Sequence, residues 1–293
     1  MYDARDMTLC IGALTFCDTI KPEPCIALCF DSLASCGDVY SSETEHKFRV
    51  LSDNLVCLFA GSTARAKELA MIYQGLLKHE PLPADPTGAL EYLRKGPVEL
   101  KRRLANSYAG ARLAVSYDDL RQNGEAWFGH DRWQRHIEAI DKHDPNVEMI
   151  IAGFIGKVPL LYRIAKDTSG WLDVEPVTNF CAIGTGAYTA EPALHAREQA
   201  ANGSLPKTLY NIYEAKKIGE TSPAVGKKTA IIVARSERKE DMGVIRLQRL
   251  GGIGEKALQR LFRKHGPKPV MPFDLPDGSL QDTVSIRGRA GMV

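Results

Sequence analysis

The sequence predicts an α+β protein built as a four-layer αββα sandwich, in which two antiparallel sheets pack together and helices cover the outside. The first observation is the order of the expected elements, which runs strands, two helices, strands, two helices, strands. Runs of like elements favour this arrangement over a βαβ alternation. The second is composition: 293 residues, 44% hydrophobic and 25% charged, suffice for a sizeable core in a globular chain.

The N-terminal part of the chain has the pattern of β-strands. "MTLCIGALTF" is the candidate first strand, "DTIKPEP" is a proline-bearing turn, and the mostly apolar "CIALCFDS" has the length of a second strand. "HKFRVLSDNLVCLFAG" predicts two further strands around a Ser-Asp-Asn turn, because Lys47 and Arg49 alternate with Phe48 and Val50.

The hydrophobic period then changes to that of a helix. Residues 62–79 predict a helix with Ser62 or Thr63 as its N-cap. A second helical region is expected from about Thr87 to Leu120, broken near Gly96-Pro97. The polar, tryptophan-containing residues 125–143 predict a connecting helix.

The second half of the chain returns to strands. Residues 147–166 predict a hairpin that turns at Gly156-Lys157, residues 180–201 a strand, a glycine turn and a helix, and residues 205–220 another helix. Two late strands are expected, at 227–237 and 242–250.

The composition changes at Gly251, and we interpret residues 251–293 as a C-terminal extension. A short helix within it carries Lys256, Arg260, Arg263 and Lys264, either as a solvated cap or as a clasp between subunits. The Pro/Gly-rich remainder is expected to lie along the surface.

Charge and cysteine usage exclude several classes of function. A net charge of +2 gives no electrostatic reason to expect nucleic acid or an anionic membrane as a partner. No apolar run approaches the ~20 residues that span a bilayer, and "MYDARDM" lacks the apolar region of a secretory signal. The 7 cysteines show no metal-binding spacing. We therefore expect a cytoplasmic protein with reduced thiols, no metal site and no cofactor.

Residues 7–66 resemble the N-terminal half of a proteasome β-type subunit, a member of the N-terminal-nucleophile hydrolases. That family combines an N-terminal Thr, an Asp that ends the second strand, a Gly in the next turn, a Lys in the third strand and an Ala-Gly that ends the fourth. These positions are occupied here by Thr8, Asp31, Gly37, Lys47 and Gly61. The intervals after Asp31 are those of the family. The longer interval before it is accounted for by a hairpin insertion around the proline-bearing turn.

The second half resembles the family more weakly. "FCAIGTGAYTAEPAL" is similar to the family's Gly-Ser-Gly turn before a helix, with Thr185 in place of the serine, which implies a supporting role for Thr185. The family's late Asp-x-x-Ser-Gly is absent, and Glu220 and Ser222 are both candidates to replace it. The resemblance implies a proteasome-like hydrolase domain over residues 8–250.

The resemblance assigns a role to each of these residues. A hydroxyl needs a base before it can act as a nucleophile, and an N-terminal threonine carries its own, an α-amine with a pKa of ~8. Thr8 would be the nucleophile, and the Lys47 ammonium would disfavour protonation of the amine and hold Oγ. Asp31 would hold Lys47, and the Gly61 N–H would stabilise the developing oxyanion.

Thr8 can act in this way only as the first residue of a mature chain. Residues 1–7 are either a propeptide removed by self-processing or a segment ahead of the true start. The family cleaves a Gly-Thr bond, whereas Met7 precedes Thr8 here. We favour translation from Met7 followed by its removal by a methionine aminopeptidase, which resembles bacterial proteasome-like proteins that need no propeptide.

The resemblance implies a threonine-type endopeptidase that hydrolyses peptides or unfolded protein inside a self-compartmentalised homo-oligomer of one ring or stacked rings, with an ATPase unfoldase as a further partner. One alternative is a non-catalytic ring subunit of the proteasome α type, which would carry a helical N-terminal extension. Another is an N-terminal-nucleophile amidohydrolase of small molecules. Each site residue alone has an ordinary structural interpretation, and the ordered combination favours the peptidase.

Overall fold

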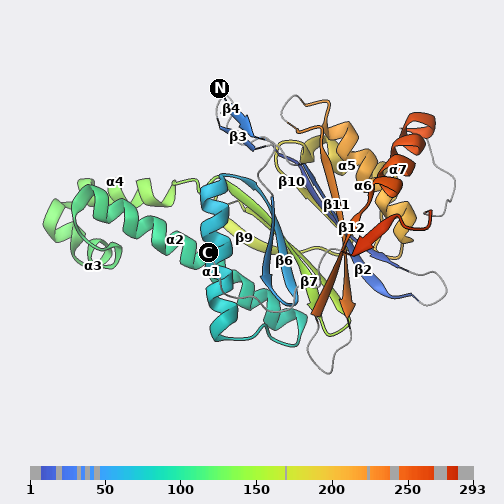
Figure 1. The fold of residues 1–293 in the computed structure, drawn as a ribbon. Helices are drawn as coiled ribbons and strands as arrows, with labels where there is room; N and C mark the ends of the chain where they lie inside the picture. The colour runs from blue at the N-terminus through green and yellow to red at the C-terminus, as the bar shows by residue number, and fades with distance from the viewer. Residues whose placement is uncertain are drawn as a thin grey trace.

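Two antiparallel sheets lie face to face in the computed structural model, and helices cover their outer faces (Figure 1). The structure describes residues 8–17, 22–31, 34–36, 40–42, 47–168, 170–222, 225–237, 244–266 and 276–282. Residues 1–7 and the predicted turn residue Gly37 lie outside this part of the chain.

The first sheet has six strands in the order β10-β1-β2-β11-β12-β13. Asp31 ends β2, where it pairs with Thr229 at the start of β11. The backbone just before β11 therefore arrives beside Asp31. The strands are β1 (Cys10–Phe16), β2 (Pro24–Asp31), β10 (Phe180–Ile183), β11 (Thr229–Glu237), β12 (Val244–Leu250) and β13 (Leu280–Asp282).

The second sheet has five strands in the order β5-β6-β7-β8-β9, and Lys47 lies directly before its first strand. A separate two-stranded sheet pairs β3 (Ala34–Cys36) with β4 (Tyr40–Ser42). The short β9 was not among the expected strands. The five strands are β5 (Phe48–Ser52), β6 (Leu55–Gly61), β7 (Val147–Ile155), β8 (Val158–Lys166) and β9 (Leu172–Pro176).

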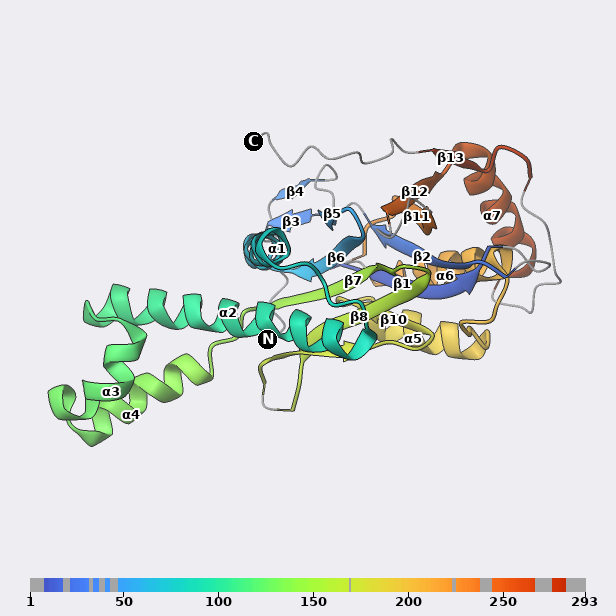
Figure 2. The same ribbon diagram turned by 90° about the horizontal axis from the view of Figure 1, so that it is seen from below.

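Burial on both faces explains why the central strands are apolar throughout. Along β1, Cys10 and Leu14 pack between the two sheets, whereas Ile11 and Ala13 pack against helices. The helices α1 (Thr63–His79) and α2 (Pro86–Leu113) cover the five-stranded sheet, and α5 (Ala187–Ala196) and α6 (Leu205–Gly219) cover the six-stranded sheet. The predicted αββα sandwich of two antiparallel sheets is confirmed (Figure 2).

The predicted break at Gly96-Pro97 is wrong, because α2 continues through both residues. Proline cannot donate the helical hydrogen bond to the carbonyl of Leu93. The hydroxyl of Tyr73, on α1, donates to that carbonyl instead, at 2.7 Å. A Cβ on Gly96 would lie 2.3 Å from Tyr73 Cζ, so glycine is what lets the ring approach. The Gly-Pro pair thus packs α1 against α2 without ending the helix.

The end of α2 and two further helices form an arm that projects from the sandwich (Figure 2). The expected helix to Leu120 ends at Leu113, and Ala114 adopts a left-handed φ of 56°. Ser116 then caps α3 (Tyr117–Phe128), accepting from the N–H of Asp119 at 3.0 Å. Gly129, with φ of 75°, separates α3 from α4 (His130–Asp141). The expected connecting helix is therefore divided between α3 and α4.

The extension after Gly251 adds to the six-stranded sheet and its helices. The expected short helix is α7 (Gly252–His265), whose Leu258 is buried in the cluster that α6 shares with the sheet. The strand β13 pairs with β12 and was not expected from the sequence. In the described part of the chain, no helix combines the length and the apolar character needed to cross a membrane.

Candidate active site

The turn between β10 and α5 holds the backbone of Thr8, which lies just before β1. The N–H of Gly186 donates to the Thr8 carbonyl at 3.2 Å. Gly184 has φ of 86°, and a Cβ on it would lie 2.2 Å from the same oxygen. A side chain at this position would therefore both strain the turn and push Thr8 away. The Thr8 residue is 3% exposed.

The side chains of Thr8, Asp31 and Lys47 are far apart in the sequence and lie together in the structure. Lys47 Nζ donates a hydrogen bond to Thr8 Oγ1 and forms an ion pair with Asp31 Oδ1 at 2.9 Å. The other carboxylate oxygen, Asp31 Oδ2, accepts from the N–H of Gly226 at 2.8 Å. The side chains of Lys47 and Asp31 are 7% and 0% exposed. The ammonium is thus held between a hydroxyl and a buried carboxylate that has a partner on each oxygen.

Burial and charge act in opposite directions on this carboxylate. Burial raises the pKa of Asp31 above its ordinary value, and the charge and hydrogen bond of Lys47, followed by the N–H of Gly226, oppose the rise. A buried charge that loses its partner is strongly destabilising, so Asp31 and Lys47 depend on each other.

The thiol of Cys10 lies close to the same charges without sharing their chemistry. It donates to the carbonyl of Phe59 at 3.4 Å. Burial raises the pKa of Cys10 well above its usual value, although the Lys47 charge opposes this. Since the thiolate is the nucleophilic form, burial makes Cys10 a poor nucleophile.

Gly61 ends β6 near the glycine turn that holds Thr8. A Cβ on Gly184 would lie 3.1 Å from the Cβ of Ala60, so the two segments are in close contact. Gly61 has φ of 85°, and a Cβ there would lie 2.4 Å from the carbonyl oxygen of Asn146. Packing alone therefore requires glycine at this position. Its role as the oxyanion donor stays a prediction.

Thr185 lies in the turn that holds the backbone of Thr8, and its supporting role stays a prediction. It is exposed, and within the described residues its hydroxyl makes no hydrogen bond to Thr8, Asp31 or Lys47. Glu148 of β7 supports this turn instead, because its Oε2 accepts from the N–H of Gly184 at 2.6 Å. The sequence did carry a signal for Glu148, which is the one acidic residue in the apolar strand "VEMIIAGFI".

Neither candidate for the missing late motif contacts the three side chains in the described part of the structure. The Glu220 carboxylate accepts from Lys217 Nζ at 2.8 Å and also from Lys216. Ser222 accepts from the N–H of Val225 through its carbonyl, at 3.1 Å. The backbone of Gly226 takes the position beside Asp31, which sequence reasoning had not foreseen.

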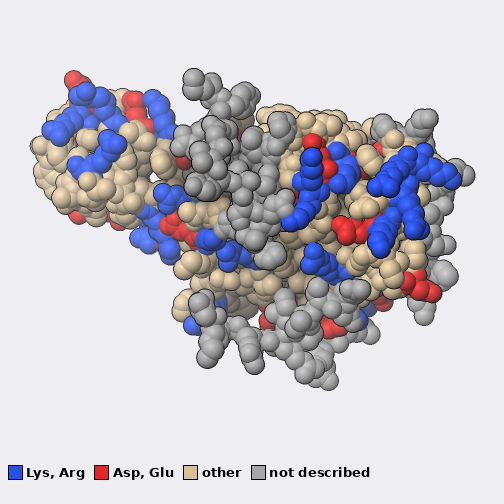
Figure 3. All heavy atoms as spheres, turned by 45° about the horizontal axis from the view of Figure 1, so that its top comes forward, with Lys and Arg blue, Asp and Glu red and all other residues tan. Residues whose placement is uncertain are grey.

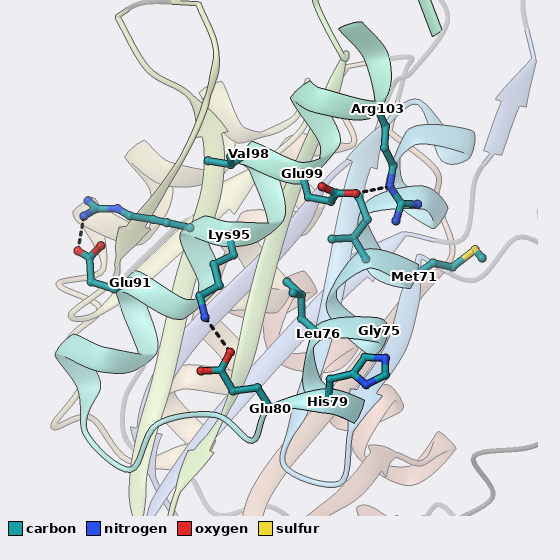
Figure 4. A pocket seen from close by; sticks show the side chains of 12 residues that line it. Met71, Gly75, Leu76, His79, Glu80, Glu91, Lys95, Val98, Glu99 and Arg103 are labelled. Carbon is teal, nitrogen blue, oxygen red and sulfur yellow. Dashed lines mark hydrogen bonds and ion pairs between the residues drawn. The ribbon is translucent and has the colours of Figure 1, made fainter. Parts of the chain in front are cut away.

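The cavity between α1 and α2 is separate from Thr8 (Figure 4). It has a volume of about 680 Å³, and Met71 and Val98 on its lining are 66% and 67% exposed. Ion pairs rim it, including Lys95–Glu80 at 2.8 Å. None of the predicted site residues lines it. Among the described residues, no cluster of His, Cys, Asp and Glu is arranged to hold a metal ion.

Comparison with solved structures shows a shared fold at low sequence identity. The helical assembly of the Anbu complex from Pseudomonas aeruginosa matches with a TM-score of 0.58 and 15% identity, over 88% of this chain and 92% of that chain. Eukaryotic HslV from Trypanosoma brucei matches with a TM-score of 0.45 and 17% identity, over 77% and 98%. No protein-family model and no curated protein matches the sequence.

The close approach of Gly184 to Thr8 leads to a test of how the site is held. Gly184→Ala should destabilise the protein more than Gly170→Ala, because both glycines have a similar positive φ but nothing lies within 4 Å of a Cβ on Gly170. We expect about 1–2 kcal/mol for Gly170→Ala from backbone strain and a further 1–3 kcal/mol, roughly, for Gly184→Ala from overlap. Urea unfolding measures the loss of stability in both variants. Equal losses would contradict the close contact between Gly184 and the Thr8 carbonyl.

Proposed function

We propose that the protein is a threonine-type endopeptidase of the N-terminal-nucleophile class, with Thr8 as its nucleophile. The observation that carries the proposal is the buried contact of Lys47 Nζ with Thr8 Oγ1, with Asp31 holding the same ammonium at 2.9 Å. A lysine that only filled a solvated strand face would be exposed, whereas the side chain of Lys47 is 7% exposed.

The chemistry follows from what each group can give and accept. In a chain that begins at Thr8, the α-amine takes the proton of Oγ1, and Oγ1 attacks the peptide carbonyl carbon. The Lys47 ammonium favours the neutral amine and stabilises the oxygen as it loses its proton. The N–H of Gly61 is proposed to stabilise the carbonyl oxygen as it becomes negative.

Collapse of the tetrahedral intermediate breaks the peptide bond and leaves an ester on Thr8. The departing amine takes the proton from the α-ammonium, which restores the base. Water then attacks the ester carbonyl, gives its proton to the same amine, and releases the acid product with Oγ1 protonated again. The proposal assigns this chemistry to residues 8–250, with residues 251–293 as an extension.

We propose that copies of the chain form a ring or stacked rings that enclose their active sites. Peptides or unfolded protein would be the substrate, delivered by an ATPase unfoldase. The related fold of a helical assembly, the Anbu complex, supports self-association. The exposed basic residues of α7 lie on an open face (Figure 3) and suit either solvation or contact with another subunit. These residues are Lys256, Arg260, Arg263 and Lys264.

The assembly has a direct test. Size-exclusion chromatography with light scattering should give the mass of an oligomer at micromolar protein concentration. A stable monomer that cleaves peptides would contradict the enclosed site, because a single subunit cannot surround its own nucleophile.

The nucleophile predicts a specific N-terminus. Intact mass of the active protein should correspond to a chain that starts at Thr8, by loss of Met7 or of residues 1–7. Thr8→Ala should abolish cleavage of short fluorogenic peptides and leave assembly intact, because it removes only a hydroxyl and a methyl group. An active protein that is mostly intact from Met1 would defeat the proposal. Cleavage of small amides in preference to peptides would favour an amidohydrolase, and no cleavage by a chain starting at Thr8 would favour a non-catalytic subunit.

Lys47 provides the sharpest test of mechanism. Lys47→Ala should lower kcat by about 100- to 10,000-fold, the range for loss of a group that assists proton transfer. Lys47→Arg should not rescue activity, because a planar guanidinium is larger than the ammonium that fits between Thr8 and Asp31. Lys157→Ala, in the exposed turn between β7 and β8, is the matched control. Activity within a few-fold of wild type in Lys47→Ala would leave the fold standing and the mechanism without support.

A further inference from the structure

A second buried lysine lies behind the ion pair of Asp31 and Lys47. Lys216, near the end of α6, is 0% exposed. Its ammonium donates to the Glu220 carboxylate and to the carbonyl of Gly226. Burial lowers the pKa of Lys216, and the hydrogen bond and charge of Glu220 oppose this. Moving an ammonium from water into the protein interior costs free energy. The reaction proposed at Thr8 does not use Lys216, so a different role has to account for its burial.

Gly226 connects this lysine to the site. Its N–H donates to Asp31 Oδ2 at 2.8 Å, and its carbonyl accepts from Lys216. Glycine has the greatest backbone freedom of all residues, so a hydrogen bond on one side of it does not fix the other. With its N–H and its carbonyl both bonded, Gly226 is held from two sides, and the direction of the N–H toward Asp31 is set.

We propose that Lys216 is a positioning residue: by holding Gly226, it fixes the N–H that orients Asp31, and through Asp31 it places Lys47 against Thr8 Oγ1. The inference rests on the proposed function of Thr8 as nucleophile. It assigns to Lys216 no contact with substrate or with the reacting atoms.

The charges around Asp31 predict how activity should depend on pH. The groups that face this carboxylate are Lys47 before β5, Lys216 from α6, and the thiols of Cys10 on β1 and Cys29 on β2. Burial raises the pKa of Asp31, and Lys47, the Gly226 N–H and the Lys216 charge lower it, in that order. Loss of Lys216 removes one lowering charge and frees the Gly226 N–H. Asp31 would then take up its proton at a higher pH, and a neutral carboxyl no longer pairs with Lys47.

Lys217 provides a matched control within the same helix. Its ammonium also pairs with Glu220, at 2.8 and 3.0 Å, but it reaches the carbonyl of Lys227, at 3.5 Å, rather than that of Gly226. Lys217→Met therefore removes the same charge from the same carboxylate and leaves the contact with Gly226 in place. Conversely, Lys216→Met leaves Glu220 paired with Lys217, which favours a folded variant.

The experiment compares the full-length wild type, Lys216→Met and Lys217→Met. It measures kcat and KM for a fluorogenic peptide as a function of pH, thermal unfolding, and hydrogen exchange of backbone amides by mass spectrometry. We expect Lys216→Met to lower kcat by about 10- to 100-fold, as for loss of the groups that orient metal ligands, with little change in KM. Its acid limb should move to higher pH, and the amide of Gly226 should exchange faster. Lys217→Met should match the wild type.

The outcomes separate this inference from the proposed function. A folded Lys216→Met with the kcat, pH profile and exchange of the wild type would overturn the positioning role and leave the peptidase standing. If Lys216→Met does not fold, Lys216→Gln, which removes the same charge and keeps a polar side chain at the position, should also move the acid limb to higher pH; no shift overturns the inference. If the wild type cleaves no peptide, the proposed function fails. The rate of hydrogen exchange at the Gly226 amide then tests the inference by itself. Equal exchange rates in Lys216→Met and Lys217→Met would overturn the role of Lys216 in holding Gly226.

Discussion

The ion pair of Lys47 and Asp31 is the constraint on which the rest of the site depends. Burying an ammonium without a partner costs roughly several kcal/mol of folding free energy. Lys47 can therefore be buried only where a carboxylate pairs with it. Asp31 ends a strand of the six-stranded sheet, and Lys47 lies directly before the five-stranded sheet. The 2.9 Å contact between them therefore forms only when the two sheets pack face to face. The site therefore depends on the packing of the two sheets.

Much of the fold could be predicted because it follows from local period and burial. Strands buried on both faces are apolar throughout, and α1 repeats its apolar residues at helical spacing, so order and type of element could be inferred. The break at Pro97 could not, because the hydroxyl that satisfies Leu93 comes from Tyr73 on another helix. The strands β9 and β13 are short edge strands, and pairing with a neighbour rather than their own pattern defines them.

The candidate site, like the fold, could be predicted from the sequence only in part. Thr8, Asp31 and Lys47 could be placed together because their order and the interval from Asp31 to Lys47 resemble those of proteasome β-type subunits. The roles assigned to them stay predictions. Thr185 was chosen by its place in a glycine turn, where the residue is exposed. Gly226 and Lys216 could not be found, since the hydrogen bond from Gly226 to Asp31 joins residues 195 apart, through a backbone group that no side-chain pattern marks.

Outward from Thr8 the charges alternate in sign, through the buried Lys47, Asp31 and Lys216 to the half-buried Glu220. Stability alone does not explain them, because apolar side chains of similar volume in place of a buried ion pair are often neutral or stabilising. What apolar side chains cannot supply is direction. An ammonium hydrogen bond to Thr8 Oγ1 needs its carboxylate held, and the carboxylate needs a fixed N–H. In the role proposed for it, the second lysine extends that requirement to α6, and elements of both sheets and of the helical layer behind one of them then orient a single hydroxyl.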